Sequence, residues 1–328
     1  MTAFLRKPTL ARRLGLAALL LGLAAPAMAL DNYPSRAVKI VVPVPPGVVL
    51  DTLPRMIAEK LAIKWAKPVV IENRAGAATN IGTEAVSKAE PDGYTLLAAP
   101  SSPLVVNQFI YSRLGFDPAA FVPVTQLART PFGIVLHPNI QVSTLAEFIA
   151  YARANPDKIT YGSPGLGTTP QLAVAKLMSA AGIRLVHVTY QGMAPAMRDL
   201  LAGHIDMTID LLGNAVPQVK EGKLKMLAVT SANRNPALPD VPAMSETVPG
   251  YAFEDWFSIV APPKTPSGIV AKLAADIGEA LKAPDIAKRL DDLFVVAVGS
   301  TPAETAAMIA QERERWRRDI DALGIKVE

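Results

Sequence analysis

The 328-residue chain contains no cysteine, which excludes disulfides, thiolate catalysis and cysteine-ligated metal centres. Its formal charge is +4, but four of the 33 basic residues and none of the 29 acidic residues lie in the first 29 positions. The remaining 29 basic residues balance the 29 acidic ones, so charge gives no support for nucleic-acid or acidic-membrane binding. Half of the residues are hydrophobic, so the part after position 29 can bury a large core and is long enough for two lobes.

The first 29 residues have the pattern of a secretory signal peptide. Arg6, Lys7, Arg12 and Arg13 precede the apolar run 14–25, and Ala27-Met28-Ala29 is a small-residue cleavage site. The apolar run is shorter than the roughly 18 to 20 residues of a transmembrane helix, and no later segment reaches that length. We therefore expect a soluble exported protein cleaved near Ala29. The Arg12-Arg13 pair leaves the twin-arginine route open, but we favour the general secretory route.

The segment 38–51 contains the first strand-loop-helix unit. Its β-branched start, 38–42, predicts a strand that is covered on both faces. The strand must end at the turn residues Pro43, Pro45, Pro46 and Gly47. Asp51 is predicted to cap a helix whose apolar residues recur every four positions, at Leu53, Ile57, Leu61 and Trp65. Such a loop is where open α/β sheets bind small ligands, although an ordinary βα turn explains the same residues equally well.

Two further units of this kind follow. Buried strands are predicted at 68–72 and 94–98, and Asn80 is expected to cap a helix that ends near Ala89. The third strand ends in the small polar loop 100–103, again at the carboxyl end of a strand. Three strand-loop-helix units by residue 110 predict a doubly wound parallel sheet.

A second set of elements begins after the strand 121–127, with another strand at 133–136, and here we place the first crossing between lobes. Capping boxes are predicted at 144–147 and 301–304. Strands at 160–162, 184–188, 207–210 and 226–230 alternate with helices at 169–181, 194–202 and 215–221, and glycine follows each helix. The aromatic strand 251–260 is the predicted return crossing, and a helix from Ser267 and a terminal helix follow. The two crossings form a hinge around a cleft.

Common catalytic motifs are not found. The segment 162–165 is not a nucleophile elbow, because Tyr161 stands where the first glycine is needed. Gly165-Leu166-Gly167 lacks the third glycine of a dinucleotide fingerprint, because Pro170 occupies that place. The three histidines, His137, His187 and His204, are far apart in the sequence and favour structural roles over a metal site.

The residues that remain in these loops suit a carboxylate. The segment 161–169 offers hydroxyls and glycines between a strand and a helix, and 190–195 is a third loop of this kind. Asp210 ends an apolar strand, where an unpaired carboxylate is costly, so it is expected either to cap backbone N–H groups or to face the cleft, and capping is favoured.

Several ordered motifs carry a family resemblance: 33–36, 43–47 with Asp51, 72–76, 80–82, 91–96, 161–169 and 237–242. Over essentially the whole mature chain, the sequence resembles the substrate-binding proteins of tripartite tricarboxylate transporters, the Bug family. The resemblance implies a type II-like periplasmic-binding-protein fold of two lobes, each an α/β doubly wound sheet. With the crossings placed above, lobe one would be 30–127 plus 255–328 and lobe two 128–254.

The implied function is that of a monomeric, non-catalytic periplasmic receptor. It would close on a small carboxylate and deliver it to a two-component membrane permease, without a cofactor, a metal or nucleic acid. A sensor that presents its ligand to a membrane kinase is an alternative that the sequence does not separate from transport. A secreted α/β hydrolase or lyase is a second alternative, against which the lack of a nucleophile-base pair at recognisable spacing counts.

By the same resemblance, two opposed loops grip the ligand, with further residues nearby. The expected ligand residues are Pro45, Gly47, Val48, Val49, Leu50, Asp51, Ser101, Ser102, Ser163, Gly165, Gly167, Thr168, Thr169, Tyr190 and Asp210. The family usually has further glycines and a threonine where Val48, Val49 and Leu50 stand here. Three bulky apolar side chains add an apolar wall, which favours an aromatic or otherwise partly apolar carboxylate, such as a benzene- or pyridine-carboxylic acid.

Overall fold

The structure is a computed structural model that describes residues 32–324. The predicted signal peptide and its cleavage site near Ala29 lie outside the described residues. Two compact units divide the chain between Ser35 and Arg36, and every element discussed below belongs to the second unit. No helix within 32–324 has the length and apolar character that crossing a bilayer requires.

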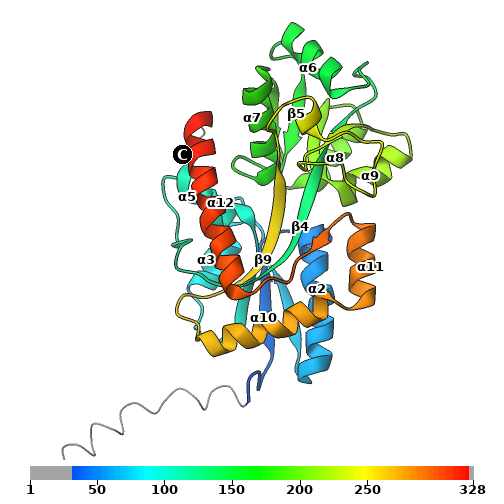
Figure 1. The fold of residues 1–328 in the computed structure, drawn as a ribbon. Coiled ribbons are helices and arrows are strands. Elements are labelled where there is room, and N and C mark those ends of the chain that lie inside the picture. Colours follow the sequence, from blue (N-terminus) through cyan, green and yellow to red (C-terminus); the bar gives the residue numbers. More distant parts are fainter. Residues whose placement is uncertain (1–31, 325–328) are drawn as a thin grey trace, which may run out of the picture. The chain divides into compact units, whose positions relative to one another are not determined.

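A ten-stranded mixed sheet runs through this unit (Figure 1). In its first half β1 (Val38–Val42) lies parallel to and between β2 (Val69–Asn73) and β3 (Thr95–Pro100), as the βαβ pattern predicts. However, β9 (Glu254–Ala261) runs antiparallel to β3 and to β4 (Val122–Leu136). The short β10 (Val296–Ala297) pairs with the other edge of β4. The sheet is therefore mixed, because a chain segment that returns from the second half enters it antiparallel.

The second half of the sheet begins on the same strand β4. Its carboxyl-terminal part pairs with β7 (Met207–Leu211) and β8 (Lys225–Val229), and β5 (Thr160–Ser163) lies parallel to β7 and to β6 (Val186–Thr189). One 15-residue strand thus replaces the two strands predicted at 121–127 and 133–136. Pro131 stands where β4 changes partner from β9 to β7, a place where a missing backbone donor is tolerated. In Figure 1, β4 and β9 run side by side between the two halves.

The helices have the following bounds: α2 Val49–Trp65, α3 Asn80–Ser87, α4 Ser101–Val105, α5 Asn107–Ile110, α6 Leu145–Ala154, α7 Thr169–Ala181, α8 Met193–Leu201, α9 Leu212–Lys220, α10 Ser267–Leu281, α11 Pro284–Asp292 and α12 Pro302–Leu323. A short 3-10 turn, η3, spans Met244–Glu246. Thr144 and Thr301 cap α6 and α12 as predicted, each accepting from the N–H three residues on.

Four local predictions were wrong. Asp51 is not a cap but the third residue of α2, because the helix already begins at Val49. Asn80 is inside α3, and its Oδ1 instead accepts from Asn107 Nδ2 at 2.6 Å. The loop predicted at 100–103 is the start of α4, since proline is tolerated in a first turn. The strand at 68–72 is not fully buried, because β2 is the edge of the sheet and leaves Val70 49% exposed.

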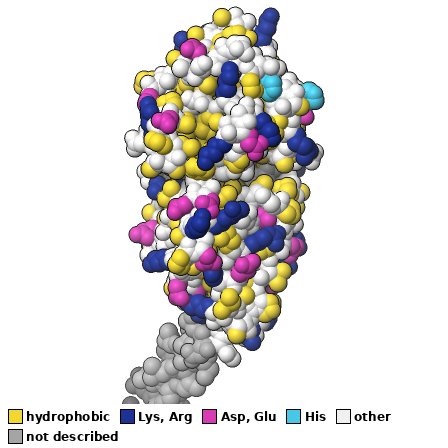
Figure 2. Space-filling model, turned by 90° about the vertical axis from the view of Figure 1, so that its right-hand side faces the viewer, with side chains coloured by type: hydrophobic (Ala, Val, Ile, Leu, Met, Phe, Trp, Pro, Cys, Tyr) yellow, Lys and Arg dark blue, Asp and Glu magenta, His cyan; other side chains and the backbone are white. Residues whose placement is uncertain are grey.

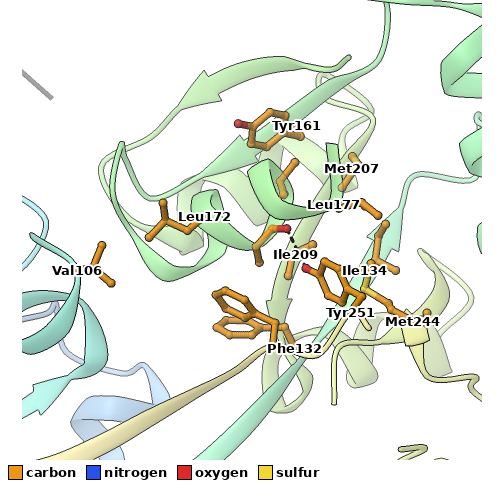
Figure 3. Packing of buried hydrophobic residues seen from close by; sticks show 14 of the residues in the cluster. Val106, Phe132, Ile134, Tyr161, Leu172, Leu177, Met207, Ile209, Met244 and Tyr251 are labelled. Atoms are coloured by element: carbon orange, nitrogen blue, oxygen red, sulfur yellow. Dashed lines mark hydrogen bonds between the residues drawn. The ribbon is translucent and has the colours of Figure 1, made fainter. Parts of the chain in front are cut away.

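Aromatic packing joins the sheet to the terminal helix and to α7. Phe253, just before β9, lies with its ring 5.8 Å from Phe132 of β4 and 5.6 Å from Trp316 of α12, between ring centroids. Tyr251 is fully buried, and its hydroxyl donates to the Ala173 carbonyl at 2.8 Å. Figure 3 shows Tyr251 beside Ile134 and Met244, with Phe132 below them. This core fixes the crossing strands against helices from both halves of the sheet.

Candidate functional site

A cavity of about 520 Å³ lies where loops from both halves of the sheet meet. On one side it is lined by the residues that follow β1, β2 and β3, and on the other by those that follow β5, β6 and β7. Phe132 of β4 and Phe257 of β9 also line it. Carboxyl ends of strands are the usual ligand position in α/β sheets, and the volume is within the roughly 300–1,000 Å³ of small-molecule sites. The full lining is Pro43, Val44, Pro45, Val48, Leu50, Ala75, Gly76, Ala77, Ala78, Thr79, Pro100, Ser102, Phe132, Pro164, Gly165, Thr168, Thr169, Pro170, Thr189, Tyr190, Gln191, Gly192, Met193, Asp210, Leu211, Asn214, Asp255 and Phe257.

Six helices begin at the wall of this cavity. The N-cap residues of α2, α3, α4, α7, α8 and α9 all line the cavity: Val48, Thr79, Pro100, Thr168, Gly192 and Leu211. The side chains of these six residues accept no capping hydrogen bond, whereas Thr144 and Thr301, away from the cavity, cap their helices. None of these six helices is therefore capped by the side chain of its own N-cap residue, and the partial positive charge of each helix start lies at the cavity wall.

Charged side chains contribute only negative groups to the cavity. Among the described residues that line it there is no lysine, arginine or histidine, but there are two aspartates, Asp210 and Asp255. On the face that Figure 2 shows, acidic and basic side chains are mixed, without a large single-sign patch. A bound anion would therefore be held by backbone donors, hydroxyls and helix ends rather than by a basic cluster.

Asp255 has hydrogen-bond partners that fix it in place. Its Oδ1 accepts from the Ser101 hydroxyl at 2.7 Å and from the Trp256 N–H at 2.8 Å. Burial raises the pKa of this carboxyl, and these bonds offset part of the rise. The carboxylate thereby ties the start of α4 to β9, which is a structural role.

Asp210 differs, because one of its two oxygens is unpartnered. Oδ1 accepts from the Leu211 N–H at 2.7 Å and from Asn214 Nδ2 at 3.1 Å, as the capping interpretation predicts. Oδ2 is buried without a hydrogen-bond partner among the described residues, and the side chain lines the cavity. Burial raises the pKa of Asp210 to about 6, against its hydrogen bonds. Asp210 therefore both caps and contributes to the cavity wall.

The loop after β1 is held from behind by Asp51. Its carboxylate accepts from the Gly47 N–H at 2.9 Å, from Asn73 Nδ2 at 2.8 Å and from Arg55 at 2.8 and 2.9 Å. Burial opposes the ionised form, but these donors outweigh it and lower the pKa of Asp51. Asn73 also donates to the Val44 carbonyl at 3.0 Å. Asp51 thus shapes the loop and does not line the cavity.

Nine of the fifteen residues that the sequence assigned to the site line the cavity: Pro45, Val48, Leu50, Ser102, Gly165, Thr168, Thr169, Tyr190 and Asp210. Six do not: Gly47, Val49, Asp51, Ser101, Ser163 and Gly167. Val49 is buried behind the loop, since neighbouring residues at a helix start point in different directions. Of the three residues predicted to form an apolar wall, only Val48 and Leu50 line the cavity.

The other absences from the lining have local causes. Ser101 is turned to Asp255, and the Ser163 Oγ lies 2.6 Å from His187 Nε2 and is fully buried. His187 stacks on Tyr161, and burial lowers its pKa, which agrees with the predicted structural role. Gly167 has a φ of +75°, and a Cβ there would lie 2.2 Å from Ile110 Cδ1. Its role is close approach to α5.

The sequence-based assignment missed the segment 75–79 and several residues of the crossing strands. The segment follows β2, beside the loop after β1, and this position at the carboxyl end of a strand could have identified it. Its left-handed backbone, with φ of 45°, 47° and 75° at Ala77, Ala78 and Thr79, is not apparent from the residue types. Phe132, Phe257 and Asp255 carry no motif, so only the pairing of β4 with β9 reveals them.

Within 32–324 no cluster of three histidine, aspartate or glutamate side chains could hold a metal ion. The lining instead combines helix ends and hydroxyls with apolar walls. Such a cavity can bind a small organic anion, and it presents no arranged nucleophile, base and oxyanion donor.

Comparisons with known proteins find relatives of this chain by sequence and by fold. Residues 53–325 match the model of the family described as tripartite tricarboxylate transporter family receptor. A protein from the tcbD-tcbE intergenic region of Pseudomonas sp. (strain P51) is 37% identical over 295 residues, covering 89% of this chain and 88% of its own. An R. palustris protein solved with adipate is 33% identical, with a TM-score of 0.85 over 90% of this chain and 99% of its own. The periplasmic binding protein BugD is 31% identical, with a TM-score of 0.84 over 90% and 100% of the two chains.

Proposed function

The chain belongs to the tripartite tricarboxylate transporter receptor family, and we propose that it captures a small, partly apolar carboxylate, of the benzene- or pyridine-carboxylic type, in the periplasm. It then delivers this ligand to a two-component membrane permease. The protein is a solute-binding receptor and not an enzyme. The family model describes receptors, and the solved relative BugD is a periplasmic binding protein. The proposed lobes are 30–127 plus 255–328 and 128–254, with β4 and β9 as the connection.

The convergence of the six N-cap residues is the observation that carries the carboxylate assignment. Helix N-termini on both sides of a cavity favour an anion there without a basic side chain, because first-turn N–H groups and helix dipoles act together. The relative solved with adipate supports a carboxylate as the ligand class.

The apolar part of the lining supports the narrower ligand class. Val48 and Leu50 line the cavity on one side, and Phe132 and Phe257 of the crossing strands line it as well. A ring packs on such walls with little loss of conformational entropy, whereas the apolar walls offer no hydrogen bonds to replace the hydration that a tricarboxylate loses there. The two acidic side chains in the lining also disfavour ligands of high negative charge.

The test is thermal unfolding of the chain from Leu30, refolded to remove carried-over ligand, against benzoate, pyridine carboxylates, adipate, citrate and amino acids. A ligand at about 100 times its Kd stabilises the fold by roughly 2.7 kcal/mol, which is several degrees of Tm at this size. We expect the largest shifts with the aromatic acids. A shift confined to citrate or amino acids would contradict the narrower class, and no shift with any carboxylate would contradict the receptor proposal.

A double variant, compared with a control variant, tests the apolar wall directly. Val48→Gly combined with Leu50→Thr should weaken benzoate binding at least tenfold, because both side chains leave the cavity wall. Val49→Ala is the matched control, since Val49 is buried behind the loop and does not line the cavity. If calorimetry gave equal benzoate affinities for the double variant and the Val49→Ala control, the wall would not select the ligand.

A further inference from the structure

Asp210 presents an unusual group in the cavity wall. The side chain is 2% exposed, and its Oδ1 is occupied by the Leu211 N–H and by Asn214 Nδ2. Its Oδ2 has no hydrogen-bond partner within the described part of the chain. A proton on this carboxyl would therefore sit on Oδ2, because Oδ1 already accepts two hydrogen bonds.

The surroundings of β7 supply no cation for an ionised Asp210. The charged or titratable side chains on the elements packed against it are Arg129 of β4, Tyr161 of β5, Lys176 of α7, Arg198 and Asp199 of α8 and Lys220 of α9. None of these lines the cavity. The lining adds only Asp255, which is held by Ser101 and Trp256, and the Tyr190 phenol, which donates to Asp199 at 2.7 Å.

A ligand carboxylate that enters this cavity would meet Asp210 in a desolvated space. If Asp210 stayed ionised, two like charges would share a region of low dielectric constant, which is strongly unfavourable. A proton on Oδ2 removes this repulsion and turns the unpartnered acceptor into a donor for the ligand. The pKa of Asp210, already raised by burial to about 6, lies close enough to neutrality for a bound anion to complete the protonation.

We propose that Asp210 binds the ligand in its protonated form, so that the receptor takes up one proton with each carboxylate it captures. This inference rests on the proposed function. The proton comes from solvent, is carried on Oδ2 as a hydrogen bond to a ligand oxygen, and returns to solvent when the ligand leaves; no other bond is made or broken. Asp210 is then a specificity-determining residue for carboxylates, and binding is tighter in more acidic solution.

The experiment counts protons during binding. Calorimetric titrations with benzoate and with adipate at pH 7.5, in buffers of different ionisation enthalpy, give the number of protons taken up by the unmodified protein. For the acid that binds, we expect nearly one proton to be taken up per ligand bound. The Kd should then increase by almost tenfold between pH 7 and pH 8. The Asp210→Asn variant should bind without proton uptake and with a nearly constant Kd.

Asp157→Asn is the control, because it removes an exposed carboxylate that lies outside the cavity, and uptake should persist in it. Binding of either acid to the unmodified protein without proton uptake would overturn the inference but leave the receptor intact. Proton release would also overturn it, since release would mean that binding favours an ionised group and not a protonated one. Uptake that persists in Asp210→Asn would place the proton elsewhere. Failure of both acids to bind would instead contradict the proposed ligand class, and this inference with it.

Discussion

Replacement of Asp210 by asparagine should change how the stability of the ligand-free protein depends on pH. Burial raises the pKa of Asp210 to about 6 from its usual 3.8. In the unfolded chain the group ionises near 3.8, and in the folded protein only near 6, so unfolding releases a proton between these values. The free energy of unfolding therefore falls as the pH rises through this window, because the folded state disfavours the charge.

The size of the effect follows from the shift. A difference of about 2 pH units corresponds to about 3 kcal/mol, at roughly 1.4 kcal/mol per unit, and almost no discount for solvent applies at 2% exposure. Asparagine preserves the shape and does not ionise. From pH 4, where the unfolded chain is already partly ionised, to pH 7 the unmodified protein should therefore lose roughly 2 to 2.5 kcal/mol relative to Asp210→Asn, or about 4 °C of Tm.

Urea unfolding of both proteins at intervals from pH 4 to pH 7.5, without ligand, measures this difference directly. The Asp157→Asn variant is the control, because it removes a carboxylate that is exposed and not buried. Parallel curves for Asp210→Asn and the unmodified protein would refute the reasoning, since they would mean that Asp210 ionises in the fold as it does in water.

Two further substitutions test how the loops around the cavity are supported. Asn73→Ala removes the donors to the Val44 carbonyl and to Asp51, so it should lower the free energy of unfolding by about 1–3 kcal/mol and weaken ligand binding through the loop after β1. Thermal unfolding measures the first effect and titration the second. Unchanged affinity would contradict the link between this loop and ligand binding. Gly167→Ala places a Cβ against α5, whereas Gly182→Ala places one in open space, and both glycines have positive φ. The loss in free energy of unfolding should therefore be larger for Gly167→Ala by at least about 1 kcal/mol. Equal losses would show that the close approach of Gly167 to α5 is unimportant.

Local pattern was sufficient for the elements around the cavity. β1 occupies the residues predicted, and α7 and α10 begin where predicted, because apolar periodicity and turn residues act within one element. Loops at the carboxyl ends of strands were therefore recognisable as ligand loops. The proposal of a carboxylate ligand came from their hydroxyls and glycines.

Fine placement within those loops was less predictable. Asp51 and Asn80 carry the residue types of caps, yet tertiary hydrogen bonds to Asn73 and Asn107 use their side chains. Val48, Val49 and Leu50 read as one apolar wall, but the start of α2 turns the middle residue into the core. One residue of helix register is enough to reassign a side chain from ligand cavity to core.

Residues that are neighbours along the chain were enough to predict the family, the βαβ units and most of the loops that line the cavity. Which distant residues share the cavity depends on the tertiary structure. Phe132 and Phe257 meet there because β4 and β9 pair across more than a hundred residues, and no local pattern encodes that pairing. The unpartnered oxygen of Asp210 is likewise set by what packs around β7. Its sequence neighbours Leu211 and Asn214 supply the hydrogen bonds to Oδ1, but burial, which has the larger effect on its pKa, comes from the tertiary structure.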